Sequence, residues 1–463
     1  MRERKPATRP ALRLASLTVA ATLAATSPGG AETLESALAR AYGGNPVLNA
    51  GRAGVRIRDE DVAAAQSGYR PTVSIDADIG VSKFQGRFSG ANIDQTTLPG
   101  GAGLTVNQTL FNGFQTDNRT RGAESRVMQE RETLRFTELT TLFNAVQAYM
   151  NVLSDTASLE LRRNNVEVLE EQLRQTRDRF NVGEVTRTDV AQAEARLAGA
   201  RSDVSAAEAQ LRASIGIYRQ VIGVEPRQLA PGRPLDRFVP GNLNAAIDIG
   251  LKEHPSILST LHAVDVAEAQ VRVAEGQLYP TVGLSGQVNQ RYDQQLANSN
   301  GVTAAIVGRV TIPIFQGGAE YAAIRQAKET VGQVRIQVEQ TRDQIRSAIV
   351  TAWGNLEAAK ARVIASQAQV QANEVALNGV REEARVGQRT TLDVLNAQQE
   401  LLNARVQLIL AQRDRVIFSY GVVQAMGRLT ARFVSLPVAA YSAKTHFDQV
   451  KDLWYGVRTP DGR

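Results

Sequence analysis

The sequence predicts an exported α+β membrane protein in which strands of membrane-crossing length are joined to long helices. Three observations indicate this fold class. The first residues have the composition of a secretory leader, most of the remaining chain is repeated once, and each copy changes from a helical period to a period of two and back again. Together these features account for most of the 463 residues.

Residues 1–31 have the pattern of a secretory signal peptide. A basic start is followed by an apolar run over 11–25, and small residues at 29–31 form a plausible cleavage site. The apolar run is too short to span a bilayer comfortably as a helix. We therefore expect export and cleavage after Ala31, which would leave Glu32 as the first residue.

The composition excludes several classes of function. The formal net charge is +6, but the predicted leader carries five basic residues and one acidic residue, so the mature chain is close to neutral. Basic residues are interspersed with Asp and Glu along helices, which is unlike a nucleic-acid-binding patch. Cysteine is absent, which rules out disulfides, thiolate nucleophiles, Cys-based metal sites and a lipid-modified N-terminal cysteine.

An internal duplication organises the chain. Pro71-Thr72-Val73 recurs 209 residues later as Pro280-Thr281-Val282. Further matches lie 204 residues apart: Leu110-Phe111-Asn112-Gly113 with Ile314-Phe315-Gln316-Gly317, Val182-Gly183 with Val386-Gly387, and Ile222-Gly223 with Met426-Gly427. The first copy thus has five extra residues between its strands. Because loops tolerate insertions, we expect a loop at 84–101 and a shorter one at 291–303.

The repeat divides the chain into five parts. They are the signal peptide (1–31), a first repeat of helix, β-hairpin 72–111 and long helix pair (32–223), a linker (224–241), a second repeat of helix, β-hairpin 281–315 and long helix pair (242–427), and a C-terminal tail (428–463).

Periodicity predicts the elements of each copy. Residues 34–69 and 243–278 are expected to be helical, with a break at Asn45-Pro46, which suit an N-cap and a first helical position. Four segments then alternate apolar and polar residues, and each is about ten residues long, enough for a tilted strand to cross a bilayer. Residues 114–181 and 318–385 lack proline, so each could form one helix about 100 Å long.

Two hairpins cannot close a barrel in a membrane. A sheet edge that faces lipid has unpaired backbone groups with no water to satisfy them, and the smallest closed membrane barrels have about eight strands. The chain must therefore oligomerise, either as a dimer with eight strands or as a trimer with twelve. This argument does not choose between them.

The motifs resemble the TolC-like outer-membrane factors of efflux pumps and type I secretion. The resemblance runs from Glu32 to about Gly427. It rests on Asn45-Pro46, Tyr69-Arg70-Pro71, Leu110-Phe111-Asn112-Gly113 and the paired Val-Gly turns. The tail ending in Trp454-Tyr455-Gly456-Val457-Arg458, and the missing cysteine, are more similar to the secretion branch.

The resemblance implies a homotrimer in the outer membrane of a Gram-negative cell. A twelve-stranded β-barrel surrounded by outer-membrane lipid would continue into an α-helical barrel across the periplasm, with an equatorial belt formed by 224–241 and part of the tail. The implied function is an exit duct for protein or small-molecule substrates. Its implied partners are a periplasmic adaptor (membrane-fusion) protein and an inner-membrane ABC transporter or proton-driven efflux pump.

The turns between the paired long helices carry the candidate site residues. Glycine can end one helix and Thr or Asp can cap the next, so helix caps alone are one explanation of Gly183, Gly387 and Asp189. The resemblance implies a second explanation, in which the turns form the periplasmic tip that closes the channel and receives the adaptor. The adaptor-docking residues are then Val182, Gly183, Val386 and Gly387.

The resemblance also assigns roles within the tip. Thr188 and Asp189 match positions that restrain the closed tip through contacts to an arginine, which Arg389 matches. Asp393 and Asn396 match the pore constriction, where a ring of carboxylates would attract cations.

Two departures from the family pattern change these expectations. Ala384 stands where some members have a tyrosine that helps to lock the tip, and Asn396 stands where some have a second acidic residue. We therefore expect a weaker lock and one acidic ring instead of two.

The sequence shows no catalytic constellation, so we expect no enzyme, cofactor or metal site. His254, His262 and His446 are scattered, and the glycine-rich run 100–103 lacks the Lys-Ser/Thr of a phosphate-binding loop. The main alternative is a periplasmic coiled-coil adaptor or a structural protein of an export system. Either would also have a leader and long helices, but neither accounts for the duplicated strands.

Overall fold

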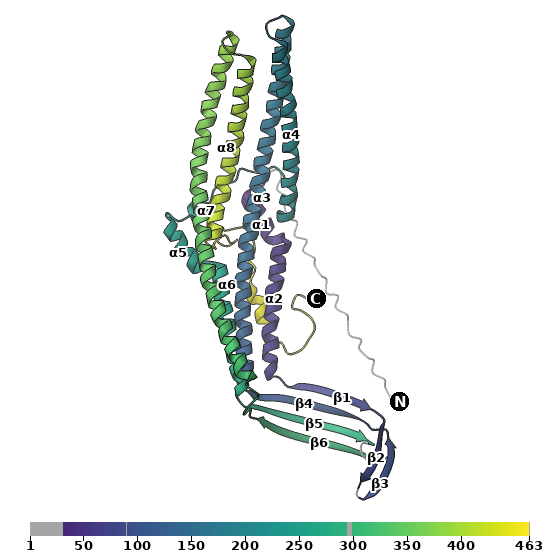
Figure 1. The fold of residues 1–463 in the computed structure, drawn as a ribbon. Coiled ribbons are helices and arrows are strands. Elements are labelled where there is room, and N and C mark those ends of the chain that lie inside the picture. Colours follow the sequence, from purple (N-terminus) through teal and green to yellow (C-terminus); the bar gives the residue numbers. More distant parts are fainter. Residues whose placement is uncertain (1–30, 89, 294–298, 463) are drawn as a thin grey trace, which may run out of the picture.

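The computed structural model describes residues 31–88, 90–293 and 299–462. The molecule is elongated, with paired helices at one end and a curved sheet at the other (Figure 1). The predicted signal peptide lies outside the described residues, except for Ala31.

The two halves of the chain have the same order of long elements. The first half contains α1 (Leu34–Gly44), α2 (Pro46–Gln66), β1 (Thr72–Ile79), β4 (Gly100–Asn112), α3 (Gln115–Asn181) and α4 (Arg187–Ile222). The second half contains α5 (Leu243–Glu253), α6 (Pro255–Glu275), β5 (Thr281–Tyr292), β6 (Asn300–Thr311), α7 (Ala319–Arg385) and α8 (Thr391–Ala425). The short elements are η1 (Ser67–Tyr69), η2 (Asp236–Phe238), η3 (Gly276–Leu278) and α9 (Ala443–Val450).

Each half begins with two helices separated by a capping residue. The Asn45 side chain accepts a hydrogen bond from the Val47 amide at 2.9 Å, and Pro46 is the first residue of α2. This confirms the predicted break. In the second half, Nδ1 of His254 accepts from the Ser256 amide at 3.2 Å, in the same position before a proline.

The four long strands form one antiparallel sheet in the order β1-β4-β5-β6. Thr281, the first residue of β5, pairs with Asn112 at the end of β4 and with Thr311 at the end of β6. All the connections to helices therefore leave the sheet at the same end of the strands, as Figure 1 shows. The predicted strands of membrane-crossing length are confirmed, with 8 to 13 residues each.

The loop predicted at 84–101 is wrong. This segment forms a second hairpin, made of β2 (Ser82–Phe88) and β3 (Ala91–Thr97), beyond the far edge of the sheet (Figure 1). The Lys83 ammonium lies 3.6 Å from the Asp94 carboxylate on the opposite strand. Cross-strand polar pairs of this kind stabilise a ribbon that has no regular apolar face.

The shorter loop predicted at 291–303 is also too long. β5 continues to Tyr292 and β6 starts at Asn300, while 294–298 lie outside the described residues.

The long helices form two hairpins. α3 and α7 have 67 residues each, or about 100 Å at 1.5 Å per residue, which confirms the length predicted from the missing prolines. α3 packs along α4, and α7 along α8. Both turns lie at the end of the molecule away from the sheet (Figure 1).

The largest buried cluster lies between these ends, where both halves and the tail meet. It contains Tyr149 on α3, Tyr218 on α4 and Met426 after α8, all fully buried. The Tyr149 hydroxyl lies 2.6 Å from the backbone oxygens of both Glu32 and Ala230, so it ties the start of the described chain to the connection between the halves.

Within the described ranges, no helix is sufficiently long and apolar to cross a membrane.

Candidate functional site

The two hairpin turns have the same local structure. Gly183 and Gly387 both adopt a φ of 80°, the left-handed region that favours glycine, and each follows the end of a long helix. Thr186 and Thr390 then cap the returning helices. The sequence pattern Gly-x-x-Thr-x-x-Asp therefore specifies each reversal of the chain.

Asp189 and Asp393 complete reciprocal capping boxes. The Asp189 carboxylate accepts from the Thr186 amide at 2.9 Å and from its hydroxyl at 2.7 Å, and the Asp393 carboxylate accepts from Thr390 at 3.0 and 2.8 Å. These hydrogen bonds lower the pKa of both carboxyl groups. Both are therefore ionised at neutral pH, and the capping role considered in the sequence analysis is confirmed.

Two of the predicted restraint residues, Asp189 and Arg389, have a partner in their own turn. Nε of Arg389 donates to Glu383 at 2.8 Å, which raises the pKa of the guanidinium, while Thr188 is exposed. The first turn has a matching pair, in which Arg179 donates to Glu184 at 3.0 Å. The contact of Arg389 with Asp189 stays a prediction.

Asn396 has a partner that the sequence reasoning missed. Nη2 of Arg196, on α4, donates to Oδ1 of Asn396, on α8, at 2.7 Å. This hydrogen bond joins the two hairpins near their tips. Arg196 lies two helical turns after Asp189, and Asn396 lies one turn after Asp393. Helical spacing could therefore have predicted that each residue shares a helix face with the capping aspartate of its own turn.

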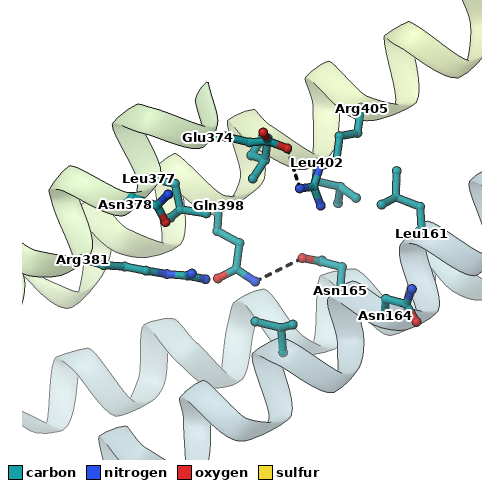
Figure 2. A pocket seen from close by; sticks show the side chains of 12 residues that line it. Leu161, Asn164, Asn165, Glu374, Leu377, Asn378, Arg381, Gln398, Leu402 and Arg405 are labelled. Carbon is teal, nitrogen blue, oxygen red and sulfur yellow. Dashed lines mark hydrogen bonds and ion pairs between the residues drawn. The ribbon is translucent and has the colours of Figure 1, made fainter. Parts of the chain in front are cut away.

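A second polar link joins the hairpins further from the tip. Nε2 of Gln398, on α8, lies 3.3 Å from Oδ1 of Asn165, on α3 (Figure 2). Gln398 is only 7% exposed, and among the described residues its Oε1 has no hydrogen-bond partner. Gln398 therefore brings an amide oxygen with no partner among the described residues into the interface between the hairpins.

The contact between Gln398 and Asn165 borders a groove between α3 and the α7–α8 hairpin. Its volume is about 440 Å³, and Figure 2 shows charged side chains from α7 and α8 along it. Arg405 donates to Glu374 at 2.7 Å, and Arg381 also lines the groove. Leucines from both hairpins also line the groove, and Leu395 of α8 clusters with Leu169 and Leu173 of α3, so the interface between the hairpins is both polar and apolar.

The histidines occupy separate places. His254 caps α6, and burial lowers its pKa to about 4. His262 lies 3.3 Å from Asp265, and His446 lies 2.9 Å from Asp59. Across the part of the chain that the structure describes, no group of His, Cys, Asp or Glu side chains could hold a metal ion.

A sheet of membrane-length strands that continues into helical hairpins about 100 Å long has the fold of an outer-membrane channel subunit. Among solved structures, the CmeC outer membrane channel of Campylobacter jejuni has a TM-score of 0.78 with 18% identity, covering 90% of this chain and 89% of that one. VceC of Vibrio cholerae has a TM-score of 0.72 with 20% identity, covering 85% and 96%.

Sequence comparison identifies the family. Residues 37–221 and 246–428 match the family described as outer membrane efflux protein. The chain is 44% identical to the outer membrane efflux protein BepC of Brucella suis biovar 1 (strain 1330), over 93% of both chains. It is 26% identical to the outer membrane protein TolC of Escherichia coli (strain K12), over 86% of this chain and 83% of that one. The chain belongs to the outer membrane efflux protein family, and it is an outer-membrane channel protein.

A protein named for secretion is also similar to this chain. The alkaline protease secretion protein AprF of Pseudomonas aeruginosa is 26% identical over 72% of both chains. The predicted TolC-like family and its role as an outer-membrane exit duct are thus confirmed. Two complete helical hairpins on a four-stranded sheet also disagree with the alternative of a periplasmic adaptor that has one hairpin.

Proposed function

We propose that three copies of this chain close a twelve-stranded barrel in the outer membrane and that their hairpins form a tube across the periplasm. The observation that carries the proposal is the open sheet. Within the described ranges its outer strands, β1 and β6, pair on one side only. Lipid cannot satisfy such edges, but β6 of one copy can pair with β1 of the next. Twelve strands leave an open lumen, whereas eight enclose a space that side chains fill.

The tube would take substrates from an inner-membrane ABC transporter or proton-driven pump through a periplasmic adaptor. The turns containing Val182, Gly183, Val386 and Gly387 supply the docking surface, because they lie at the far end from the sheet (Figure 1). One relative is named for efflux and another for protease secretion, which supports both small molecules and proteins as substrate classes. No catalytic step belongs to this proposal.

The tip would also be the gate. Arg389 with Thr188 and Asp189 restrains the closed state, and the hydrogen bond from Arg196 to Asn396 adds a link inside each chain. Hydrogen bonds from Thr390 lower the pKa of Asp393 and so keep its carboxylate ionised. The Asp393 carboxylates of the three copies form a ring that attracts cations.

A crosslinking experiment tests the assembly. The native chain has no cysteine, so Ile75→Cys on β1 and Ile306→Cys on β6 introduce the only thiols. The two strands lie at opposite edges of one sheet, so a short bis-maleimide can join them only between copies. We expect a ladder that stops at three chains, with Ile75→Cys alone as the control that stays largely uncrosslinked. A ladder that stops at two chains, or no ladder, would refute the trimer.

A further inference from the structure

The tail after α9 carries an exposed aromatic segment. Within 453–458, the exposed fractions are 46% for Leu453, 65% for Trp454, 93% for Tyr455 and 99% for Val457. A run of large apolar side chains with this exposure is costly in water, so its place in the molecule matters.

The structure fixes where this segment lies. Arg70, two residues before β1, stacks on Trp454 with its guanidinium carbon 4.9 Å from the ring centre. Its Nη1 also donates to the Leu453 backbone oxygen at 2.5 Å. Leu453 and Trp454 are therefore held near the end of the sheet from which the helices leave. The end of the chain lies beside α2 in Figure 1.

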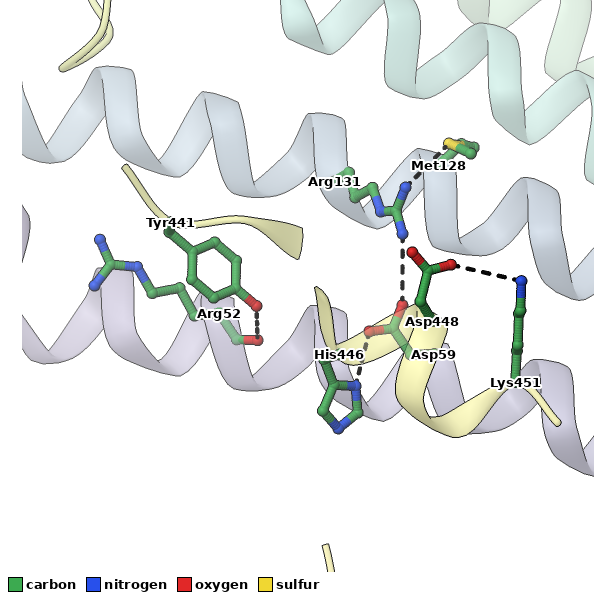
Figure 3. Close-up of polar contacts among 8 residues, drawn as sticks. All are labelled: Arg52, Asp59, Met128, Arg131, Tyr441, His446, Asp448 and Lys451. Atoms are coloured by element: carbon green, nitrogen blue, oxygen red, sulfur yellow. Dashed lines mark hydrogen bonds and ion pairs between the residues drawn. The ribbon is translucent and has the colours of Figure 1, made fainter. Parts of the chain in front are cut away.

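A second attachment holds α9, the helix before this segment, against α2 and α3. His446, on α9, lies 2.9 Å from the carboxylate of Asp59, which is fully buried on α2 (Figure 3). The guanidinium carbon of Arg131, on α3, lies 5.3 Å from the centre of the Phe447 ring. The position of Trp454 is thus set by two long helices as well as by Arg70.

Other exposed aromatic residues lie at the same end of the sheet. They are Tyr69, Phe114, Tyr279 and Phe315. In the duplication, Tyr279 occupies the position of Arg70, because Pro280 corresponds to Pro71. At this one position the second repeat therefore has an aromatic residue, whereas the first repeat has an arginine that stacks on Trp454.

One face of β1, the strand that follows Arg70, is apolar. Val73 and Ile75, on the same side of β1, are 64% and 77% exposed. In an outer-membrane channel such a face contacts lipid. Trp and Tyr concentrate where hydrocarbon meets the headgroups, and the basic residues Lys451, Arg458 and Arg70 suit lipid phosphates.

We infer that the segment 453–458 contacts the periplasmic face of the outer membrane, where Trp454 and Tyr455 enter the phospholipid headgroup region. This tail contact adds Trp454 and Tyr455 to the aromatic residues of the first repeat, Tyr69 and Phe114, and braces α2 against the bilayer. The inference rests on the sheet lying in the membrane, as in the proposed function.

The chain's two tryptophans make the test direct. Trp353→Phe leaves Trp454 as the single emitter, and Trp454→Phe leaves Trp353, which packs against the central core, as the matched control. Full-length protein is placed in phosphatidylcholine nanodiscs with or without bromine atoms near the carbonyl end of the acyl chains. We expect brominated lipid to reduce Trp454 emission by about half and to leave Trp353 emission unchanged.

A third variant tests the clamp. Adding Arg70→Ala to Trp353→Phe should release the tail and restore most of the quenched emission. Unchanged quenching in this variant would overturn the role of Arg70.

The outcomes separate this inference from the proposed function. Protein that does not enter nanodiscs argues against the membrane-inserted sheet itself. In protein that does enter nanodiscs, Trp454 emission that is not quenched by bromine and is also shielded from aqueous acrylamide shows that a neighbouring copy covers the tail. Trp454 emission that is not quenched by bromine but is quenched by acrylamide shows that the tail lies in water. Either of these last two results overturns the lipid contact.

Discussion

Arg196 and Asn396 connect the two hairpins of one chain through a hydrogen bond with a charged donor. Such a bond contributes about 1 kcal/mol, so losing it should change the ratio of open to closed tips about five-fold. We expect Arg196→Ala to raise channel conductance in planar bilayers. The control is Arg201→Ala, because Arg201 on the same helix pairs with Glu170 inside its own hairpin. Equal effects of the two variants would show that the link between hairpins does not restrain the tip.

Asp393 should determine the cation preference of the pore. Hydrogen bonds from Thr390 lower the pKa of its carboxyl group, so the charge persists well below neutral pH. Asp393→Asn keeps an oxygen for the cap and removes the charge, so the ratio of potassium to chloride permeability should fall. Reversal potentials in a salt gradient measure this ratio. Asp203→Asn, which removes a carboxylate from α4 further from the turn, should leave the ratio near its native value; a matching fall there would mean that Asp393 has no special place in the pore.

The residues at the tip show what sequence reasoning could reach. The caps follow from Gly183, Thr186 and Asp189 at fixed spacing, because capping is a local interaction. Arg196 was missed because its partner, Asn396, is 200 residues away in the chain. No local rule pairs residues across two helices whose relative rotation is set by the whole fold.

At the scale of elements, the two repeats use different residues for one task. Asn45 caps α2 and His254 caps α6, each directly before a proline. Of these two caps, only the histidine has a side chain that can gain a proton as the pH falls.

Acid should therefore weaken the second repeat through His254. Burial lowers the pKa of its imidazole from 6.5 to about 4, so the unfolded chain binds a proton between these values while the folded chain does not. Stability from this group is intact above pH 6.5 and falls as the pH drops toward 4. The loss at pH 5 is about 2 kcal/mol per chain.

His254→Asn copies the cap of the first repeat and removes the titration. Denaturant midpoints at pH 7.5 and pH 5 should lie closer together in this variant than in the native protein. His262→Asn, on the same helix, serves as the control, and an equal pH dependence in all three proteins would rule out His254 as the sensor.

The elements divide into those that the sequence predicted and one that it did not. Long helices and membrane-length strands were predictable, since proline and apolar alternation report directly on them. The β2–β3 hairpin was missed because its stability comes from polar pairs such as Lys83 with Asp94. Its residues alternate without a consistent apolar face, so the pattern indicated a loop.

At the scale of the whole molecule, the gate requires more than one hairpin. In a single chain Arg389 pairs with Glu383 in its own turn, and Asp189 pairs with Thr186 in the other. The first arrangement leaves donors available, since a guanidinium has five N–H groups and Nε uses one, and the second leaves acceptor sites, since a carboxylate can accept about four hydrogen bonds. Bringing the tips together around a central axis could therefore add a contact from Arg389 to Asp189 without breaking the local pairs.

This arrangement predicts a specific pattern of conductances. Arg389→Ser should open the tip and raise the conductance, because it removes the charge-assisted hydrogen bonds of the guanidinium. If Arg389 acts across the turns, Asp189→Asn should raise conductance nearly as much, and combining it with Arg389→Ser should add little. If Arg389 acts only inside its own turn, Glu383→Gln should reproduce the effect and Asp189→Asn should not. Planar-bilayer recordings of these four variants distinguish the two cases, and native conductance in Arg389→Ser would reject both.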